Sequence, residues 1–154
     1  MINIQILFSG IIAGIIIFHT SVVAPLVFKM LEAPFISNLL RALFPKFFIM
    51  IFVLSLANFI MSMISKCCAL NMLFLTSFLL ALMCYLLIGI TNKATDSGDK
   101  KKFALLHRIS VISTVIILLI NLAVPFIKWA RIVYCIEFVI WNLKIPISFF
   151  QKYS

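Results

Sequence analysis

Four long stretches without a charged side chain limit most strongly what this chain can fold into. Residues 1–28, 47–65, 67–92 and 109–127 contain no Asp, Glu, Lys or Arg. A helix that crosses the hydrocarbon core of a bilayer needs about 20 mostly apolar residues, and each stretch has about that length or more. Because a backbone in lipid must satisfy its own hydrogen bonds, we predict an all-α polytopic membrane protein with a bundle of four transmembrane helices.

The composition supports this fold class. The chain of 154 residues is 65% hydrophobic and only 11% charged, with a mean hydropathy of +1.26. Soluble domains carry roughly 25% charged residues, so the apolar excess must face lipid. The predicted four-helix transmembrane domain covers residues 1–127, with spans at about 6–28, 46–65, 70–91 and 107–127.

The three predicted connections differ in length and polarity. Residues 65–70 are all that separates the second span from the third, so these two helices should form a tight antiparallel hairpin. In residues 29–46, apolar side chains recur at helical spacing behind Pro34, which predicts a short interfacial helix. Residues 92–108 contain two aspartates and three consecutive lysines, so we predict an aqueous loop there.

The C-terminal tail, residues 128–154, is apolar but interrupted by Glu137, Lys144 and Pro146. A charge at the centre of a spanning helix costs roughly 2.5–3.5 kcal/mol. We therefore predict an amphipathic or interfacial tail, with its Trp and Tyr side chains at the level of the lipid headgroups.

The chain is basic, with 13 Lys and Arg against 4 Asp and Glu, a formal net charge of +9. The cations lie between apolar segments and form no stripe, so we expect the lipid bilayer as partner and no nucleic acid. The first and third connections hold most of them, while the N-terminus and the second connection hold only Lys66. The positive-inside rule then places both termini outside the cytoplasm, and the Phe-, Ile-, Lys- and Asn-rich composition favours a bacterial inner membrane.

No catalytic residue is assigned, because the spans contain no pair of carboxylates and the chain has neither a Gly-rich phosphate loop nor a nucleophile elbow. Its four cysteines form no CxxC pair. We therefore expect a protein without enzymatic activity and without a cofactor.

His19 is the main polar candidate inside a predicted span, and such a residue is by default a hypothesis for a functional site. Three roles stay open: a hydrogen bond to a neighbouring helix, a ligand to haem or a metal, and a proton relay or substrate contact. On the other face of the same helix, Gly10 and Gly14 form a GxxxG spacing that predicts helix packing. His107 and Ser110 lie one turn apart at the start of the fourth span and can address one neighbour.

Three motifs, in this order, carry a resemblance to a known family. They are the stretch from Gly14 to Phe28, the stretch from Leu43 to Phe48, and the stretch from Asp96 to Ser110. In this order they resemble the transmembrane protein 205-like domain family, over about residues 10–126. The resemblance implies a small four-helix membrane protein of undefined function. It singles out five positions: Pro25, Phe44, Pro45, His107 and Ser110.

Two functions of different classes follow. The first is an integral membrane protein without enzymatic activity that serves in transport, resistance or assembly, as a homo-oligomer or with other membrane proteins. Four short helices enclose little volume, so we expect a substrate path between protomers. The alternative is a haem- or metal-linked redox enzyme that uses His19 or His107 as a ligand.

Overall fold

The computed structural model describes residues 2–64 and 68–142 and places nearly all of them in helices, with no strand among them. In chain order these are α1 (Ile2–Phe18), the π-helical segment η1 (His19–Val23), α2 (Ala24–Met30), α3 (Ala33–Ile64), α4 (Cys68–Asp96) and α5 (Lys100–Asn142). Segments Ile4–Met30, Phe35–Ile64, Leu70–Asp96 and Lys100–Ile127 are long and apolar enough to cross a membrane. The predicted all-α class with four membrane-length helices is confirmed.

The chain divides into two compact units, residues 1–122 and 123–154. The first unit holds α1 to α4 and the beginning of α5. The second unit is described as far as Asn142 and consists of the rest of α5. The predicted tail is therefore helical from Lys128 to Asn142, while residues 143–154 lie outside the described residues. Its position at the membrane interface stays a prediction.

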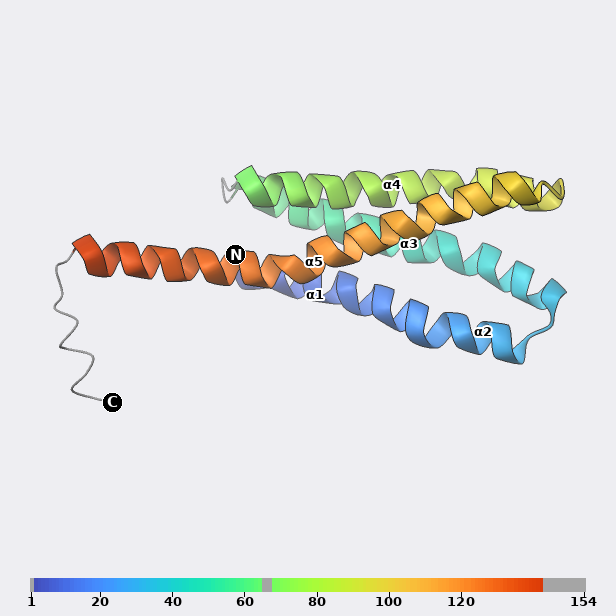
Figure 1. Cartoon of the computed structure of the whole chain (residues 1–154), viewed down its shortest axis with the longest axis horizontal. Helices are drawn as coiled ribbons and strands as arrows, with labels where there is room; N and C mark the ends of the chain where they lie inside the picture. The colour runs from blue at the N-terminus through green and yellow to red at the C-terminus, as the bar shows by residue number, and fades with distance from the viewer. Residues whose placement is uncertain (1, 65–67, 143–154) are drawn as a thin grey trace. The chain divides into compact units, whose positions relative to one another are not determined.

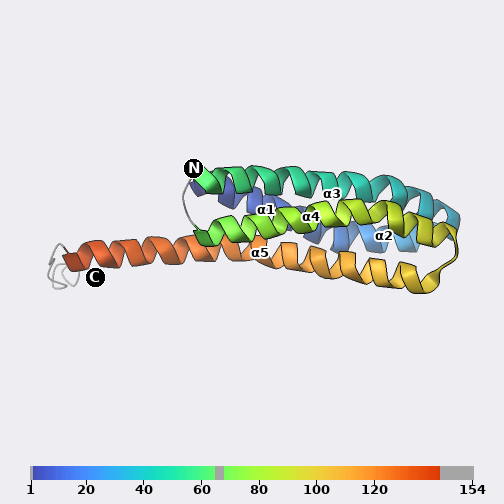
Figure 2. The ribbon, with the colours of Figure 1, turned by 90° about the horizontal axis from the view of Figure 1, so that it is seen from above.

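Helices α3 and α4 form an antiparallel pair, which Figures 1 and 2 both show side by side. Contacts near both ends of the pair establish the direction. Arg41 near the start of α3 binds Asp96 at the end of α4, whereas Phe59 near the end of α3 stacks on Phe78 at a ring-centroid distance of 6.5 Å. The pairing agrees with the short connection between the second and third spans.

The core of the first unit draws on all four long helical segments. Its buried residues are Ile12 and Ile16 of α1, Phe47, Phe48 and Ile51 of α3, Ala81 and Cys84 of α4, and Ile117 of α5. Large apolar side chains also cover the outside of the helices, as expected for a surface in contact with lipid. Packing against neighbouring helices therefore selects which apolar side chains turn inward.

The segment predicted as a separate interfacial helix at residues 29–46 is helical but not separate. Helix α3 begins at Ala33 and continues without a break to Ile64, with Pro45 inside it. Pro34 falls in the first turn, where the missing N–H is not needed, and no glycine interrupts residues 33–64. An interior proline such as Pro45 is tolerated in membrane helices because neighbouring groups satisfy the freed carbonyl.

The aqueous loop predicted for residues 92–108 is wrong in extent. Helix α4 continues to Asp96 and α5 begins at Lys100, so only residues 97–99 connect them. Gly98 adopts the left-handed conformation, with φ of 69°, that lets the chain reverse. The Asp99 carboxylate accepts a hydrogen bond of 3.0 Å from the backbone N–H of Lys102 and caps the start of α5.

Candidate functional site

A row of uncharged polar side chains lies inside the first unit, where most buried side chains are apolar. We call it the polar seam: Ser9, Ser55, Asn58, Ser77 and Asn121. Its members come from α1, α3, α4 and α5, and none is more than 1% exposed. Burying a polar group costs free energy unless it is hydrogen-bonded, so this grouping needs a physical account.

Hydrogen bonds between the seam residues join the four helices. The Asn58 amide Nδ2 donates to the Ser9 hydroxyl across 3.2 Å, which links α3 to α1. The hydroxyls of Ser55 and Ser77 share a hydrogen bond of 3.2 Å between α3 and α4. Asn121 Nδ2 donates to the Ser77 hydroxyl at 3.2 Å and so adds α5.

Two amide oxygens of the polar seam lack a hydrogen-bond donor among the described residues. Neither Asn58 Oδ1 nor Asn121 Oδ1 receives a hydrogen bond from the described part of the chain. The orientation of the Asn121 amide is determined by its surroundings, because Nδ2 also donates to the Ile117 carbonyl at 2.8 Å and a carbonyl can only accept. Buried acceptors without a donor are rare in folded proteins, and each calls for an explanation.

The polar seam occupies the half of the bundle in which α3 ends and α4 begins. On α3, Ser55, Asn58 and the buried Ser62 follow one another at i, i+3 and i+7, which places them on one face over about 10 Å of helix. One turn before Ser55, the apolar Ile51 takes over that face and is fully buried in the core. The interior thus changes from polar to apolar along the bundle.

At the other end of that apolar core, and including its Phe47 and Phe48, lies a group of rings that we call the aromatic layer: His19, Phe44, Phe47 and Phe48. The His19 ring stacks on Phe47 with centroids 4.4 Å apart and 28° between the planes. It also meets Phe44 edge-on at 5.8 Å. His19 is 9% exposed, so a polar ring is held inside the bundle mainly by aromatic contacts.

His19 also begins the π-helical segment, in which the usual hydrogen-bonding pattern of the helix is widened. Thr20, the next residue, donates its hydroxyl back to the Ile16 carbonyl at 2.9 Å. Single π-helical turns are rare in proteins and occur often at functional sites. The coincidence of this turn with the aromatic layer marks a second place of interest.

Three of the family-motif positions belong to this region. Phe44 is half-buried and contacts His19, and Pro45 is half-buried inside α3. Pro25 is exposed in the first turn of α2, directly after the π-helical segment. The contact between His19 and Phe44 was not predicted, since the two residues come from different motifs on different helices.

His107 and Ser110 lie elsewhere, on the first turns of α5. His107 is exposed and stacks on Phe103 of its own helix with centroids 5.8 Å apart. Ser110 is half-buried, and its carbonyl accepts the Thr114 hydroxyl at 2.8 Å. The contacts with Phe103 and Thr114 are local to α5, whereas the Ser110 carbonyl also accepts a hydrogen bond of 3.9 Å from Cys84 Sγ on α4.

Gly10 and Gly14 are exposed on α1, and no described atom lies within 4 Å of a Cβ built on either one. The described chain therefore does not pack another of its helices against them. Their predicted role in packing against a second molecule stays a prediction.

No group of three or more His, Cys, Asp or Glu in the described ranges is placed to hold a metal ion. This finding concerns metal ions whose ligands all come from the protein. It does not bear on haem, which needs only one or two axial ligands from the protein.

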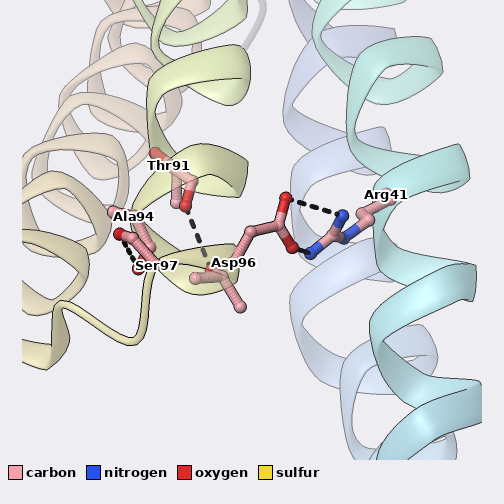
Figure 3. A network of polar contacts seen from close by, with 6 residues as sticks. Arg41, Thr91, Ala94, Asp96 and Ser97 are labelled. Carbon is pink, nitrogen blue, oxygen red and sulfur yellow. Dashed lines mark hydrogen bonds and ion pairs between the residues drawn. The ribbon is translucent and has the colours of Figure 1, made fainter.

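An ion pair joins α3 and α4 (Figure 3). It lies near the start of α3 and the end of α4, at the opposite end of these helices from the polar seam. The Arg41 guanidinium binds both carboxylate oxygens of Asp96, with Nη1 to Oδ2 at 3.3 Å. The pair brings the connections α2–α3 and α4–α5 to the same end, where basic residues on the adjoining helix ends, such as Lys29, Lys93 and Lys100, also lie. This is the end that the positive-inside rule predicts to be cytoplasmic.

Comparison with known proteins gives one match. Residues 7–93 match DUF4149, a domain of unknown function, and this covers more than half of the chain. The chain belongs to the DUF4149 family. The matched part contains the whole aromatic layer and every seam residue except Asn121. No curated protein and no solved structure shows a significant match.

Sequence reasoning missed the polar seam. A signal for it was present in the second span, where Ser55, Asn58 and Ser62 are polar at i, i+3 and i+7 within an apolar run. That spacing places polar groups on one face of a membrane helix, and such a face normally turns toward protein. The partners on α1, α4 and α5 are single residues far apart in the sequence, and no local pattern connects them.

Proposed function

We propose that this chain is an integral membrane protein without enzymatic activity that lets a small polar solute cross the bilayer. The polar seam carries the proposal, because it places hydrogen-bonding groups inside a bundle whose outside is apolar. A polar molecule that enters the seam exchanges some of its hydrogen bonds with water for hydrogen bonds with protein, which lowers the cost of leaving the aqueous phase.

The proposed path runs through the polar seam, past the apolar core that begins at Ile51, and through the aromatic layer. On the side where α3 ends and α4 begins, the polar seam receives the solute. Toward the other side, the aromatic layer closes the bundle, and passage requires His19 and Phe47 to separate. The π-helical segment and Pro45 flank this layer and supply the points at which the helices adjust.

The side chains of the polar seam also favour one kind of transport. Serine and asparagine do not ionise in the physiological range, so the seam does not relay protons by titration. This favours movement of the solute itself over proton-coupled chemistry within the seam.

Three finer assignments belong to the same proposal. The likeness to the transmembrane protein 205-like proteins supports a small four-helix membrane protein, and a role in transport, resistance or assembly is the non-enzymatic function that we propose for it. The exposed Gly10 and Gly14 support contact with a second copy or another membrane protein, although the proposed path lies within one bundle. The charge distribution supports both termini outside the cytoplasm, and the Phe-, Ile-, Lys- and Asn-rich composition supports a bacterial inner membrane.

The proposal is tested by reconstituting the purified chain into liposomes and following solute entry by stopped-flow light scattering. We expect urea and glycerol to enter faster than into protein-free liposomes, in proportion to the amount of protein. Entry rates equal to those of the protein-free liposomes for both solutes would reject transport of such molecules.

A haem-linked redox enzyme is the second candidate, and the position of His19 favours it. The imidazole is held inside the bundle by Phe44 and Phe47, an apolar setting in which a haem ligand can be protected from water. An absorption spectrum of protein produced with added haem decides the matter. A Soret band that is lost in His19→Leu supports this candidate, and a colourless sample rejects it.

A further inference from the structure

We propose that the polar seam binds a small neutral molecule that donates hydrogen bonds, and that the carboxamide oxygens of Asn58 and Asn121 receive these bonds. The inference names the solute class of the proposed transport and in that respect rests on the proposed function. The binding itself can be measured without any transport.

The first argument is the balance of donors and acceptors. Asn58 Nδ2 donates to the Ser9 hydroxyl, and Asn121 Nδ2 donates to the Ser77 hydroxyl and to the Ile117 carbonyl. The two amide oxygens receive nothing from the described residues and are almost fully buried. A molecule that satisfies them must bring donors, because another acceptor would leave both oxygens unpaired and add a repulsive contact.

The two oxygens belong to one part of the bundle. Asn58 lies one turn from Ser55 on α3, Ser55 bonds Ser77, and Ser77 bonds Asn121, each of these contacts being 3.2 Å long. The Asn58 amide is anchored by Ser9, and the Asn121 amide is anchored by Ser77 and the Ile117 carbonyl, so hydrogen bonds hold both amides in place. A site with anchored acceptors loses little side-chain entropy when a ligand binds.

The second argument concerns charge. The buried polar residues of the first unit are Ser, Asn, Gln and one His, and no Asp, Glu, Lys or Arg is among those described. An ion in this interior would have no opposite charge beside it and would lose its hydration, which costs far more than burying a neutral molecule. The site therefore favours a neutral donor over Na⁺ or K⁺.

The surroundings limit the size of the ligand. On one side the seam meets Ile12, Ile51 and Ile117, which are fully buried in the core cluster. On α4, the fully buried Phe74 lies one turn before Ser77. The ligand that we propose is therefore a molecule of no more than a few heavy atoms with an amide or hydroxyl donor.

The test is ligand-observed saturation-transfer NMR on the purified full chain in detergent. Acetamide and glycerol serve as donor probes, and N,N-dimethylacetamide serves as the matched probe because it keeps the carbonyl but lacks N–H donors. We expect transfer to acetamide and glycerol and little to N,N-dimethylacetamide. Equal transfer to acetamide and N,N-dimethylacetamide would overturn the proposal without recourse to any variant.

Variants place the binding in the seam. Each of Asn58→Leu and Asn121→Leu should weaken acetamide binding on the order of tenfold, the effect of losing one buried hydrogen bond. Thr76→Ala is the matched control, because Thr76 is next to Ser77, exposed, and bonded to Met72 of its own helix. Circular dichroism and gel filtration establish that each variant is folded, and Asn121→Ser replaces Asn121→Leu if the latter is not. Unchanged binding in both asparagine variants would reject the site.

Sodium and flux measurements complete the design. If Na⁺ displaces acetamide, and if the ²³Na relaxation rate changes in Asn121→Leu, the site binds a cation. That result would overturn the proposal of a neutral ligand. Binding of acetamide without flux supports this inference and rejects transport. Flux without acetamide binding to the seam supports transport and rejects this inference.

Discussion

Ser77 makes more connections within the polar seam than any other single side chain. Its hydroxyl bonds Ser55 on α3 and receives the Asn121 amide of α5, both at 3.2 Å. Hydrogen bonds between membrane helices contribute about 0.6 kcal/mol on average and up to about 1.7. We therefore expect Ser77→Ala to lower the free energy of unfolding by about 1–2 kcal/mol, measured by SDS-induced unfolding in mixed micelles.

Thr76→Ala is the control for this change, since the Thr76 hydroxyl bonds only the Met72 carbonyl one turn back. An exposed substitution of this kind should stay within about 0.5 kcal/mol. If both alanine variants lose the same free energy, the hydroxyl of Ser77 does not join the helices in the way described.

His19 allows a second prediction for a single residue, because its contacts are made by the ring. His19→Ala removes the ring stacked on Phe47 and should cost about 2–4 kcal/mol of unfolding free energy. His19→Phe keeps an aromatic ring in the same place and should cost less than about 1.5 kcal/mol. Equal losses in the two variants, measured in the same micelles, would mean that the imidazole nitrogens and not the ring contacts hold His19.

At the scale of elements, the connection between α4 and α5 depends on Gly98. Gly98 has φ of 69°, at which an alanine would be strained. Gly89, in contrast, lies inside α4 with an ordinary helical backbone. Neither position has an atom within 4 Å of an added Cβ, so packing gives no reason for the two alanine substitutions to differ in stability. We expect Gly98→Ala to destabilise by roughly 1 kcal/mol and Gly89→Ala to stabilise by about 0.5–1 kcal/mol.

Both glycine variants are measured by thermal unfolding in the same detergent. Changes of opposite sign bear out the assigned turn. Stabilisation by Gly98→Ala would show that the left-handed turn between the two helices is assigned wrongly.

Much of the element layout could be predicted from the sequence, because charge is absent only where a helix must cross lipid. The four membrane-length helices followed from that pattern. The pattern failed at residues 29–46 and 92–108, since polar residues outside the bilayer continue a helix when no break interrupts it. Thr95, for example, lies in the predicted loop, although its hydroxyl bonds the Thr91 carbonyl one turn back within α4.

The candidate site could be predicted less well, for a physical reason. His19 was identified because a polar side chain at membrane depth is conspicuous. The polar seam depends instead on which faces of four helices meet. Ser9, Ser77 and Asn121 are recognised as parts of one group only through their contacts across the bundle. Single serines in apolar helices are common, so tertiary contacts were needed to bring these three together.

At the scale of the whole molecule, orientation is the first property to establish. The Arg41–Asp96 pair brings two connections that are flanked by basic residues to one end, which we expect to be cytoplasmic. In a variant with its four cysteines replaced, Lys101→Cys should resist a membrane-impermeant maleimide in intact cells and react after lysis. Full labelling in intact cells would reverse the orientation.

The measurement that tests the central claim most directly is solute entry into proteoliposomes that contain the wild-type chain or Asn58→Leu/Asn121→Leu. If the polar seam is the path, the wild-type chain accelerates acetamide entry over protein-free liposomes, and the double variant returns the rate to that of the lipid. Thr76→Ala should match the wild-type chain. A folded double variant that still admits acetamide at the wild-type rate would contradict the account.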